Sequence, residues 1–524
     1  MSLLPRSWPR FAAWTIASLC VLTGATGCSF APASRAPEPV AALPGAFAEA
    51  DVSDAETLAV YDPQAWWTGF EDPVLNRLVD STLTGNLDLA EAIARVDQAA
   101  AQARMARSAL FPGLNGTGSG SYQNQSATNN QFSAFQGGGG DEGEGESPRG
   151  EAGPEPPDRL AFEQYSVALA ASYELDFWGR IRNETRASYA NAAAAAADLQ
   201  TARLGVIATV VSTYFEVVDL RRRIVLTLAT VDLLAERVEL TEERYTRGLV
   251  TSFELYRILQ DYRTSQASLP TLEADLTDAE GRLAVLTGRY AGRLGPLLPD
   301  TLSPALALDP VPPGQPSDLL LQRPDVRAAA YRFEAARYTV GARKAALLPT
   351  VSLSAQLGIQ GLQPDDLVNL DNWFSSLTAN LTAPLFQGGR LRANVSVAEA
   401  AYAQQAAVYG RTVLTAYQEV ESALERYEEE RQRFDFLRSQ LDDARAQDAL
   451  QTERFEQGIG DYTAVLDAQR NRLGVLTSLS GARRAVALAR LGVYRTLGGD
   501  WVAEPPTPAV DLADTPVSLP EGED

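Results

Sequence analysis

The stretch "YELDFWGRIR", Tyr173 to Arg182, returns further along the chain as "APLFQGGRLR", Ala383 to Arg392. In both copies a glycine and an arginine are followed by Ile or Leu and a second arginine, and Gly179 and Gly389 are separated by an offset of 210 (389 − 179). Glycine reaches backbone conformations that other residues avoid, so it suits an abrupt change of chain direction. The chain is therefore expected to make the same abrupt joint twice.

The repetition continues on both sides of this joint. Two further pairs recur at the same offset, with Arg244 and Gly248 returning as Arg454 and Gly458. Upstream segments return at a larger offset of 237, as Pro112 does at Pro349 (349 − 112). The two offsets differ by 27 (237 − 210), which indicates an insertion before Gly179, where the run "GGGGDEGEGESPRGEAGPEPP" has no hydrophobic anchors and is typical of a solvated loop. The chain is a tandem duplication.

The segments that lead into each joint alternate apolar and polar residues, a period of two that predicts strands. The clearest is "TVSLSAQLGIQG", Thr350 to Gly361, and others begin at Gly113, Val167 and Leu377. Strands of about ten residues with one apolar and one small, polar face are typical of a transmembrane β-barrel. Four strands cannot close such a barrel, because about eight is the smallest number, so we expect several subunits to share it.

Long helices are predicted between the strands. Proline is missing between Pro157 and Pro270 and between Pro384 and Pro505, where Ala, Leu, Glu, Gln and Arg are abundant. A continuous helix from Arg180 to Arg247 would be about 100 Å long, which requires neighbouring helices along its whole length. We expect Gly248 and Gly458 to turn each long helix back into an antiparallel hairpin. Pro270 lies inside the first returning helix, where it predicts a kink or a break.

The composition excludes several classes of function. The 524 residues contain no histidine, so a catalytic triad of the usual kind, a His-ligated metal site and a His proton shuttle are excluded. The net charge of −22 opposes binding to nucleic acid or to anionic membrane surfaces. Most enzyme functions are disfavoured, and nucleic acid is not an expected partner.

The N-terminus has the form of a secretory signal. Arg6 and Arg10 precede an apolar run, Phe11 to Leu22, that is too short for a comfortable membrane span. Small residues then lead to Cys28, in a setting similar to the cleavage box of bacterial lipoproteins, with Ala25 in place of the usual Leu. Cys28 is therefore the expected lipidation site of an exported chain. The alternative is a cleaved signal with an incidental cysteine.

Five segments, in this order, match one family: "WWTGFEDPVLNRLVDSTLTGNLDLAEAIARVDQA", "YELDFWGRIR", "ERYTRGLV", "PSDLLLQRPDVRAAAYRFEAAR" and "ERFEQGIGDYTAVLDAQRNRL". From about Trp66 to Gly499 the chain resembles the TolC-like outer-membrane efflux channels, most closely the lipoprotein branch (OprM/NodT type) of resistance-nodulation-division pumps. The resemblance implies a homotrimer in the outer membrane, in which a shared membrane β-barrel continues into a long α-helical barrel in the periplasm. It also implies a periplasmic adaptor and an inner-membrane pump as partners, export of drugs or other small molecules, and neither enzyme activity nor a cofactor.

The same resemblance implies roles for residues near the two glycine turns. Gly248 and Gly458 would form the periplasmic tip, with Arg244 and Arg454 as candidates for adaptor contact; the alternative is that these residues only cap and turn the helices. Asp467 matches an acid whose three copies ring the narrowest part of the tunnel in the family, although it could also be a solvated acid on a helix face. Asp461 is a weaker candidate for the same region.

The chain departs from the family in the ionic lock of this gate. Some members carry an arginine two residues after the tip glycine, where Gly460 stands here, and pair it with an acid of the neighbouring hairpin. Glu254 occupies that acid position. Ala464 replaces a second ring aspartate. We therefore predict a gate with a single acidic ring, formed by Asp467.

The joints of the opening paragraph would lie where a tilted membrane strand leads into a tunnel helix. Gly179 and Gly389 supply the permissive backbone there. The next residues, Arg180 and Arg390, are expected to meet a lipid headgroup or an acid of a neighbouring subunit. The extra acidic loop is expected on the extracellular side, at a hairpin tip.

These patterns, together with the family resemblance, predict a series of segments along the chain. They are a signal peptide at 1–27, a lipid-anchored segment at 28–72, equatorial and tunnel helices at 73–111, a first β-hairpin with its acidic loop at 112–178, a first helical hairpin at 179–288, a linker at 289–323, a helix at 324–348, a second β-hairpin at 349–388, a second helical hairpin at 389–498 and an acidic, Pro-rich tail at 499–524.

Other architectures are weighed against this prediction. The strands could form two amphipathic hairpins packed on the helices, but their polar faces lack the charge of a water-exposed sheet. The chain could be a trimeric coiled-coil surface protein with a barrel anchor, but such anchors sit once, at the C-terminus, whereas two hairpins are internal here. A glycosidase would need paired carboxylates in a cleft, and no such pattern is found.

Overall fold

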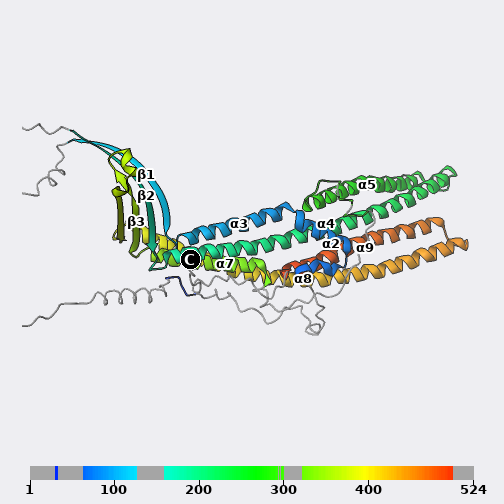
Figure 1. Ribbon diagram of the computed structural model, residues 1–524. Coiled ribbons are helices and arrows are strands. Elements are labelled where there is room, and N and C mark those ends of the chain that lie inside the picture. The colour runs from blue at the N-terminus through cyan, green and yellow to red at the C-terminus, as the bar shows by residue number, and fades with distance from the viewer. Residues whose placement is uncertain are drawn as a thin grey trace, which may run out of the picture. The chain divides into compact units, whose positions relative to one another are not determined.

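The computed structural model describes residues 30–33, 63–126, 159–292, 294–295, 297–299 and 322–499 (Figure 1). The signal peptide, Cys28, the acidic Gly-rich loop and the C-terminal tail all lie outside these residues. The chain divides into two compact units. One contains Gln102–Ala187 and Arg337–Glu399, and the other contains Ser188–Ala336 together with segments before and after it in the sequence.

The first unit is built on one antiparallel sheet of four strands in the order β1-β2-β3-β4 (Figure 1). The strands are β1 (Gly113–Ser126), β2 (Arg159–Leu175), β3 (Thr350–Gly361) and β4 (Trp373–Thr382). The two hairpins of the duplicated chain are joined through β2 and β3, which pair from Tyr165 opposite Gly361 to Leu175 opposite Val351. Strands β1 and β4 are the two edges of this sheet.

The register brings the apolar residues of neighbouring strands together. Leu169 lies opposite Leu357, and Tyr173 lies opposite Leu353. On the other face small, uncharged residues meet, as where Ser172 lies opposite Ser354 and Ser354 opposite Thr378. The predicted strands with two different faces are therefore confirmed. Several apolar side chains of the first face are more than half exposed in the single chain: Val167, Leu169, Leu357, Leu377 and Leu381. A sheet face of this kind requires lipid or a partner to cover it.

The helices reproduce the duplication position by position. Helices α3 (Leu87–Ser108) and α7 (Pro324–Ala345) both have 22 residues, and both their ends are related by the offset of 237 (324 − 87 and 345 − 108). The other helices keep the offset of 210: α4 (Arg180–Thr246) matches α8 (Arg390–Glu456), and α5 (Ser252–Leu286) matches α9 (Tyr462–Thr496).

Of the kink or break predicted at Pro270, the break is not found, because α5 continues through this residue as one helix. A proline inside a helix removes one backbone hydrogen bond and crowds the preceding turn. Leu272, two residues further on, is buried in a hydrophobic core that also contains Leu220 of α4.

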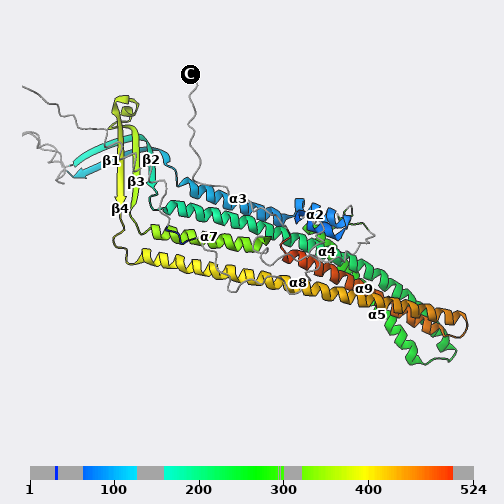
Figure 2. The same ribbon diagram turned by 90° about the horizontal axis from the view of Figure 1, so that it is seen from below.

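Helices α8 and α9 pack as a coiled coil (Figure 2). The buried residues of α8 recur every seven positions: Val420, Tyr427, Phe434 and Leu441. Those of α9 alternate steps of four and three residues, from Val475 through Leu479 and Ala482 to Val486. Both spacings place one apolar stripe on each helix along the seam, which is how long helices with little other core are stabilised.

The segment "WWTGFEDP" fastens the short helix α2 (Pro73–Gly85) to the long helices. Asp72 caps α2 by accepting hydrogen bonds from the backbone N–H groups of Val74 and Leu75, at 2.8 and 3.3 Å. The buried hydroxyl of Tyr214, on α4, donates to the same carboxylate. Burial and this bond raise the pKa of Tyr214 well above its usual value. Trp66 completes the contact by packing on the ring of Tyr494 of α9, with centroids 5.5 Å apart.

Candidate functional site

The two tip turns have the same backbone geometry. Gly248 and Gly458 have positive φ angles of 70° and 72°, and a Cβ atom would meet no other atom at either position. It is therefore the backbone conformation, not lack of space, that requires glycine there. The backbone N–H of Leu249 donates to Arg244 O at 2.9 Å, and Ile459 donates to Arg454 O at 3.0 Å. Each long helix ends in the same glycine cap.

The two tip arginines differ in their contacts. The guanidinium of Arg244 lies 3.6 Å from the carboxylate of Asp461, which also caps α9 by accepting from the N–H of Thr463 at 3.2 Å. Hydrogen bonds from Thr463 lower the pKa of Asp461 below its usual value, and Arg244 lowers it further. Arg454 is exposed and makes no ion pair with any described residue. The neutral Thr251 occupies the position of Asp461 in the first copy (461 − 210).

Asp467 lies on α9 with 60% of its side chain exposed, and it forms an ion pair with Arg237 of α4. The sequence predicts this acid in the gate but does not predict its partner. An arginine on the long helix carries no signal of its own, because only the packing of α9 against α4 brings the two side chains together. Asp467 is therefore a paired acid in the single chain.

Three more polar contacts join α9 to the first hairpin. Tyr462 donates its hydroxyl to Glu236 of α4, and Arg470 donates to Asp261 of α5 at 3.1 Å. Further from the tip, Ser480 donates to Asp219 of α4 at 2.8 Å. The second hairpin is thus fixed to the first at several points along α9.

The remaining gate residues are not brought together with Asp467. Glu254 lies in the first turn of α5, where its backbone N–H donates to the Thr251 hydroxyl at 3.4 Å. Within the described part of the chain, no hydrogen bond or ion pair joins Glu254 to Asp461 or Asp467. A Cβ at Gly460 would lie 3.0 Å from the backbone nitrogen of Phe455. An arginine at that position, as in the family's lock, would require this turn to shift.

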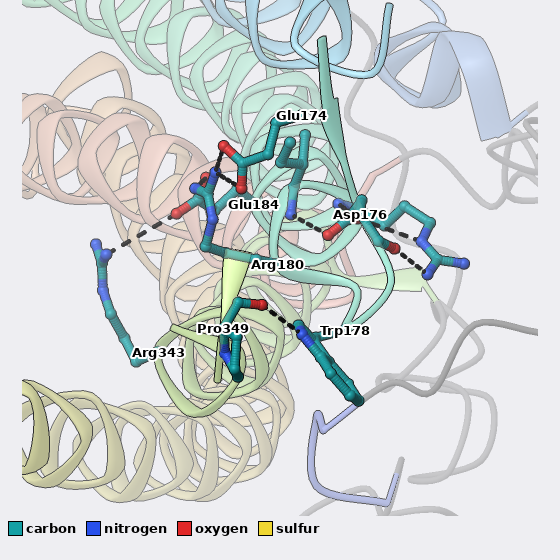
Figure 3. A network of polar contacts seen from close by, with 9 residues as sticks. Glu174, Asp176, Trp178, Arg180, Glu184, Arg343 and Pro349 are labelled. Atoms are coloured by element: carbon teal, nitrogen blue, oxygen red, sulfur yellow. Dashed lines mark hydrogen bonds and ion pairs between the residues drawn. The ribbon is translucent and has the colours of Figure 1, made fainter. Parts of the chain in front are cut away.

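The first strand-to-helix joint is held by a network of charged residues (Figure 3). Arg180 donates to both carboxylate oxygens of Glu174 at 2.8 Å and to Glu184 at 3.0 Å. The other oxygen of Glu184 lies 3.9 Å from Arg343 of α7. In the single chain Arg180 thus has acidic partners of its own, and a contact of this residue with a headgroup or with an acid of a neighbouring subunit stays a prediction.

Two further contacts fix the direction of the chain at this joint (Figure 3). Asp176 accepts from the backbone N–H groups of Ile181 and Arg182, at 3.1 and 2.8 Å, and so caps the start of α4. The indole of Trp178 donates to Pro349 O at 2.7 Å, just before β3. Within "YELDFWGRIR", Asp176 thus caps α4, Arg180 forms ion pairs and Trp178 binds the segment to the chain before β3.

The second joint keeps the glycine but has no such network among the described residues. Gly179 and Gly389 both have positive φ angles, 73° and 82°. At the offset of 210, however, Glu174, Asp176 and Glu184 are replaced by Pro384, Phe386 and Asn394. The described side-chain contact of Arg390 is a hydrogen bond to Gln387. Leu385 and Phe386 are 95% and 90% exposed. The two joints are alike in backbone and different in chemistry.

The residues that follow Cys28 lie against α7. Arg337 donates to Pro32 O at 2.8 Å. A Cβ at Gly341 would lie only 2.7 Å from the backbone nitrogen of Ala31, so glycine allows the segment to approach the helix closely. The chain just beyond the expected lipidation site is thus held on the unit that contains the sheet.

Comparison with known proteins gives a consistent result. The family described as outer membrane efflux protein matches residues 78–289 and 315–499. The chain is 30% identical over 496 residues to outer membrane protein OprJ of Pseudomonas aeruginosa, which covers 94% of this chain and 97% of that protein. It is 31% identical over 487 residues to the toluene efflux pump outer membrane protein TtgI of Pseudomonas putida, covering 91% and 96% of the two chains.

Solved structures show the same fold. The outer-membrane channel OprN aligns with a TM-score of 0.75 at 28% identity, covering 90% of this chain and 100% of that one. The CmeC channel of Campylobacter jejuni aligns with a TM-score of 0.76 at 26% identity, covering 90% and 95%. The chain therefore belongs to the outer membrane efflux protein family, and it is the outer-membrane channel component of a tripartite efflux system.

Proposed function

We propose that three copies of the chain form one closed channel, in which each contributes four strands to a β-barrel and two helical hairpins to a periplasmic tunnel. The sheet carries this proposal. Its edges β1 and β4 expose backbone donors and acceptors, and its apolar face is uncovered, two features that cannot coexist in lipid unless the edges pair. Joining β4 of one copy to β1 of the next pairs the backbone groups of both edges and leaves the apolar face turned toward lipid.

The tip turns at Gly248 and Gly458 are the proposed docking points for a periplasmic adaptor, which links the channel to an inner-membrane pump. Arg454 is the better candidate of the two tip arginines, because it is exposed while Arg244 is held by Asp461. Near the same tip, residues of α8 and α9 line a groove of about 570 Å³, among them the charged Arg445, Glu453 and Glu456. An adaptor surface with both charges would complement it.

The proposed gate is a ring of three Asp467 side chains at the narrow end of the tunnel. Its support is the position of Asp467 near the tip and its 60% exposure in the single chain. Asp461 acts in helix capping and in the contact with Arg244, and Glu254 lies near the tip without contacting either acid. Neither is assigned to the ring.

Cys28 is the proposed attachment site of a lipid anchor, exposed by removal of the signal peptide at 1–27. The contacts of Ala31 and Pro32 with α7 support this assignment, because they hold the start of the mature chain on the same unit as the sheet. An acyl chain at Cys28 would then enter the outer membrane next to the barrel.

The cargo is proposed to be small molecules that leave the cell without chemical change. The relatives are named for different cargoes, including toluene, antibiotics and pyoverdine, at 28 to 31% identity. Such a range of cargoes among equally similar channels suggests that the pump, not the channel, selects the substrate.

The channel is tested with the full-length, lipidated chain purified from outer membranes in detergent. We expect a trimer by light scattering and discrete conductance steps in planar bilayers. Expression in a strain that lacks its own channel, together with the matching adaptor and pump, should restore resistance to drugs or solvents. A monomer that opens no channel would contradict the proposal.

A further inference from the structure

Arg237 occupies an unusual position for a charged residue near the tip of the first helical hairpin. Only 8% of its side chain is exposed, although it belongs to a helix with a large exposed surface. Removing a guanidinium from water is costly unless a partner compensates its charge. The described partner is Asp467. Asp467 itself is largely exposed and could be solvated without a partner, so the pair is needed more by Arg237 than by the acid.

The duplication shows that this pair is made once per chain. The positions that match Asp467 and Arg237 in the other copy hold Arg257 (467 − 210) and Gln447 (237 + 210). Asp467 and Arg257 both lie five residues after the first residue of their helices (467 − 462 and 257 − 252), which is about 7.5 Å along the helix. Because the two glycine turns are alike, these residues are at equivalent heights in the two hairpins. Each chain therefore has an acid at this height in its second hairpin and an arginine at the same height in its first.

Neighbouring contacts fix the geometry of the pair. On the tip side, Tyr462 donates to Glu236, and Arg244 lies 3.6 Å from Asp461. Both contacts join the start of α9 to α4, as the Arg237–Asp467 pair does. The pair is thus part of a row that holds α9 against α4, and separating these helices would break all three contacts together.

We propose that Arg237 is the counter-ion of the Asp467 gate, which neutralises the acid in each subunit and holds α9 against α4 in the closed channel. The proposal rests on the proposed function as a channel with Asp467 at its narrow end. It changes the chemistry of the gate. Three neutralised pairs repel one another far less than three bare carboxylates, so closure needs no external cation, and the field in the narrow passage depends on Arg237 as much as on Asp467.

Single-channel recording in planar bilayers under a KCl gradient separates this gate from a bare acidic ring. The variants are Arg237→Gln, Asp467→Asn and the double variant. Arg237→Gln leaves the carboxylate of Asp467 unpaired, so cation selectivity should rise. Asp467→Asn leaves the guanidinium of Arg237 unpaired, so cation selectivity should fall. Either single change should increase the open fraction about fivefold, the effect of losing an ion pair of modest strength. The double variant should return to a selectivity near that of the natural chain.

Arg222→Gln is the matched control, because it removes the same charge from an exposed position on the same helix. It should change neither selectivity nor open fraction. Asp467→Asn leaves a buried arginine without its partner and could impair assembly; the double variant removes that arginine as well and keeps the comparison possible.

Selectivity that does not change in Arg237→Gln but falls in Asp467→Asn would show a bare ring and overturn the proposal. So would equal effects of Arg222→Gln and Arg237→Gln. Failure of the underlying function has a different signature, since the natural chain would then show no conductance steps at all.

Discussion

Arg180 donates to both carboxylate oxygens of Glu174, whereas Pro384 stands where Glu174 would be in the second copy of the duplication. The two strand-to-helix joints thus have different sources of stability within one chain. The first is complete by itself. The second has no such network among the described residues, and its apolar residues Leu385 and Phe386 are exposed in the single chain.

This difference predicts unequal effects of two matched substitutions. Arg180→Ala should destabilise the detergent-solubilised protein by about 1 kcal/mol, because it removes a partly buried, doubly hydrogen-bonded ion pair. Arg390→Ala, at the equivalent position, should change the free energy of unfolding by much less, since it removes one contact to an uncharged side chain. Chemical denaturation monitored by circular dichroism measures both. If both variants lost the same free energy of unfolding, the ion pairs around Arg180 would contribute no stability of their own.

The comparison of the joints also shows what could be predicted from sequence. The period of two predicted the strands, and the two repeat offsets predicted the helix pairs, because both signals lie in the spacing of residues. The partners of Arg180 and Asp467 were not predictable in the same way. Glu184 and Arg237 lie on a helix with many charged residues, and only the three-dimensional packing selects which of them meet.

The contact between Arg244 and Asp461 should be insensitive to pH over the physiological range. The pKa of folded Asp461 is lowered, so its contribution is present above the unfolded value of about 3.9 and is lost only as the pH falls through the lower folded value. Hydrogen exchange of the backbone at residues 461–467 should therefore be the same at pH 8 and pH 5, after correction for the intrinsic rate. Asp461→Asn should increase exchange at both values. A loss of protection between pH 8 and pH 5 in the natural chain would contradict this assignment.

The two tip arginines should contribute differently to adaptor binding. Arg454→Ala should weaken binding of the purified adaptor about tenfold, because the residue is exposed and its charge has no internal partner among the described residues. Arg244→Ala should weaken binding less and should loosen the tip instead, since its charge is shared with Asp461. Surface plasmon resonance with the channel in nanodiscs measures the affinities. Arg438→Ala, an exposed change further along α8, is the control. The opposite order of effects would place the docking surface on the first hairpin.

Barrel closure between subunits can be tested with cysteines on the two edge strands. The sequence has two cysteines, Cys20 and Cys28, and neither lies in a strand. A disulfide between the strands can therefore come only from the introduced cysteines. Thr117→Cys on β1 is combined in turn with Ser376→Cys, Thr378→Cys or Asn380→Cys on β4, because the shear of a closed barrel shifts the register between edges. At least one combination should give disulfide-linked species on a denaturing gel that end at three chains.

The control for this experiment pairs two cysteines inside one chain. Ser172 and Ser354 lie opposite each other on β2 and β3, so Ser172→Cys combined with Ser354→Cys should form a bond within the monomer and no ladder. A ladder from the edge variants that ends at two chains, or that continues beyond three, would give a different number of subunits. Bonds within one chain between β1 and β4 would mean that the four strands close on themselves. That outcome is opposed by sterics, because about eight strands are the fewest that enclose a membrane barrel.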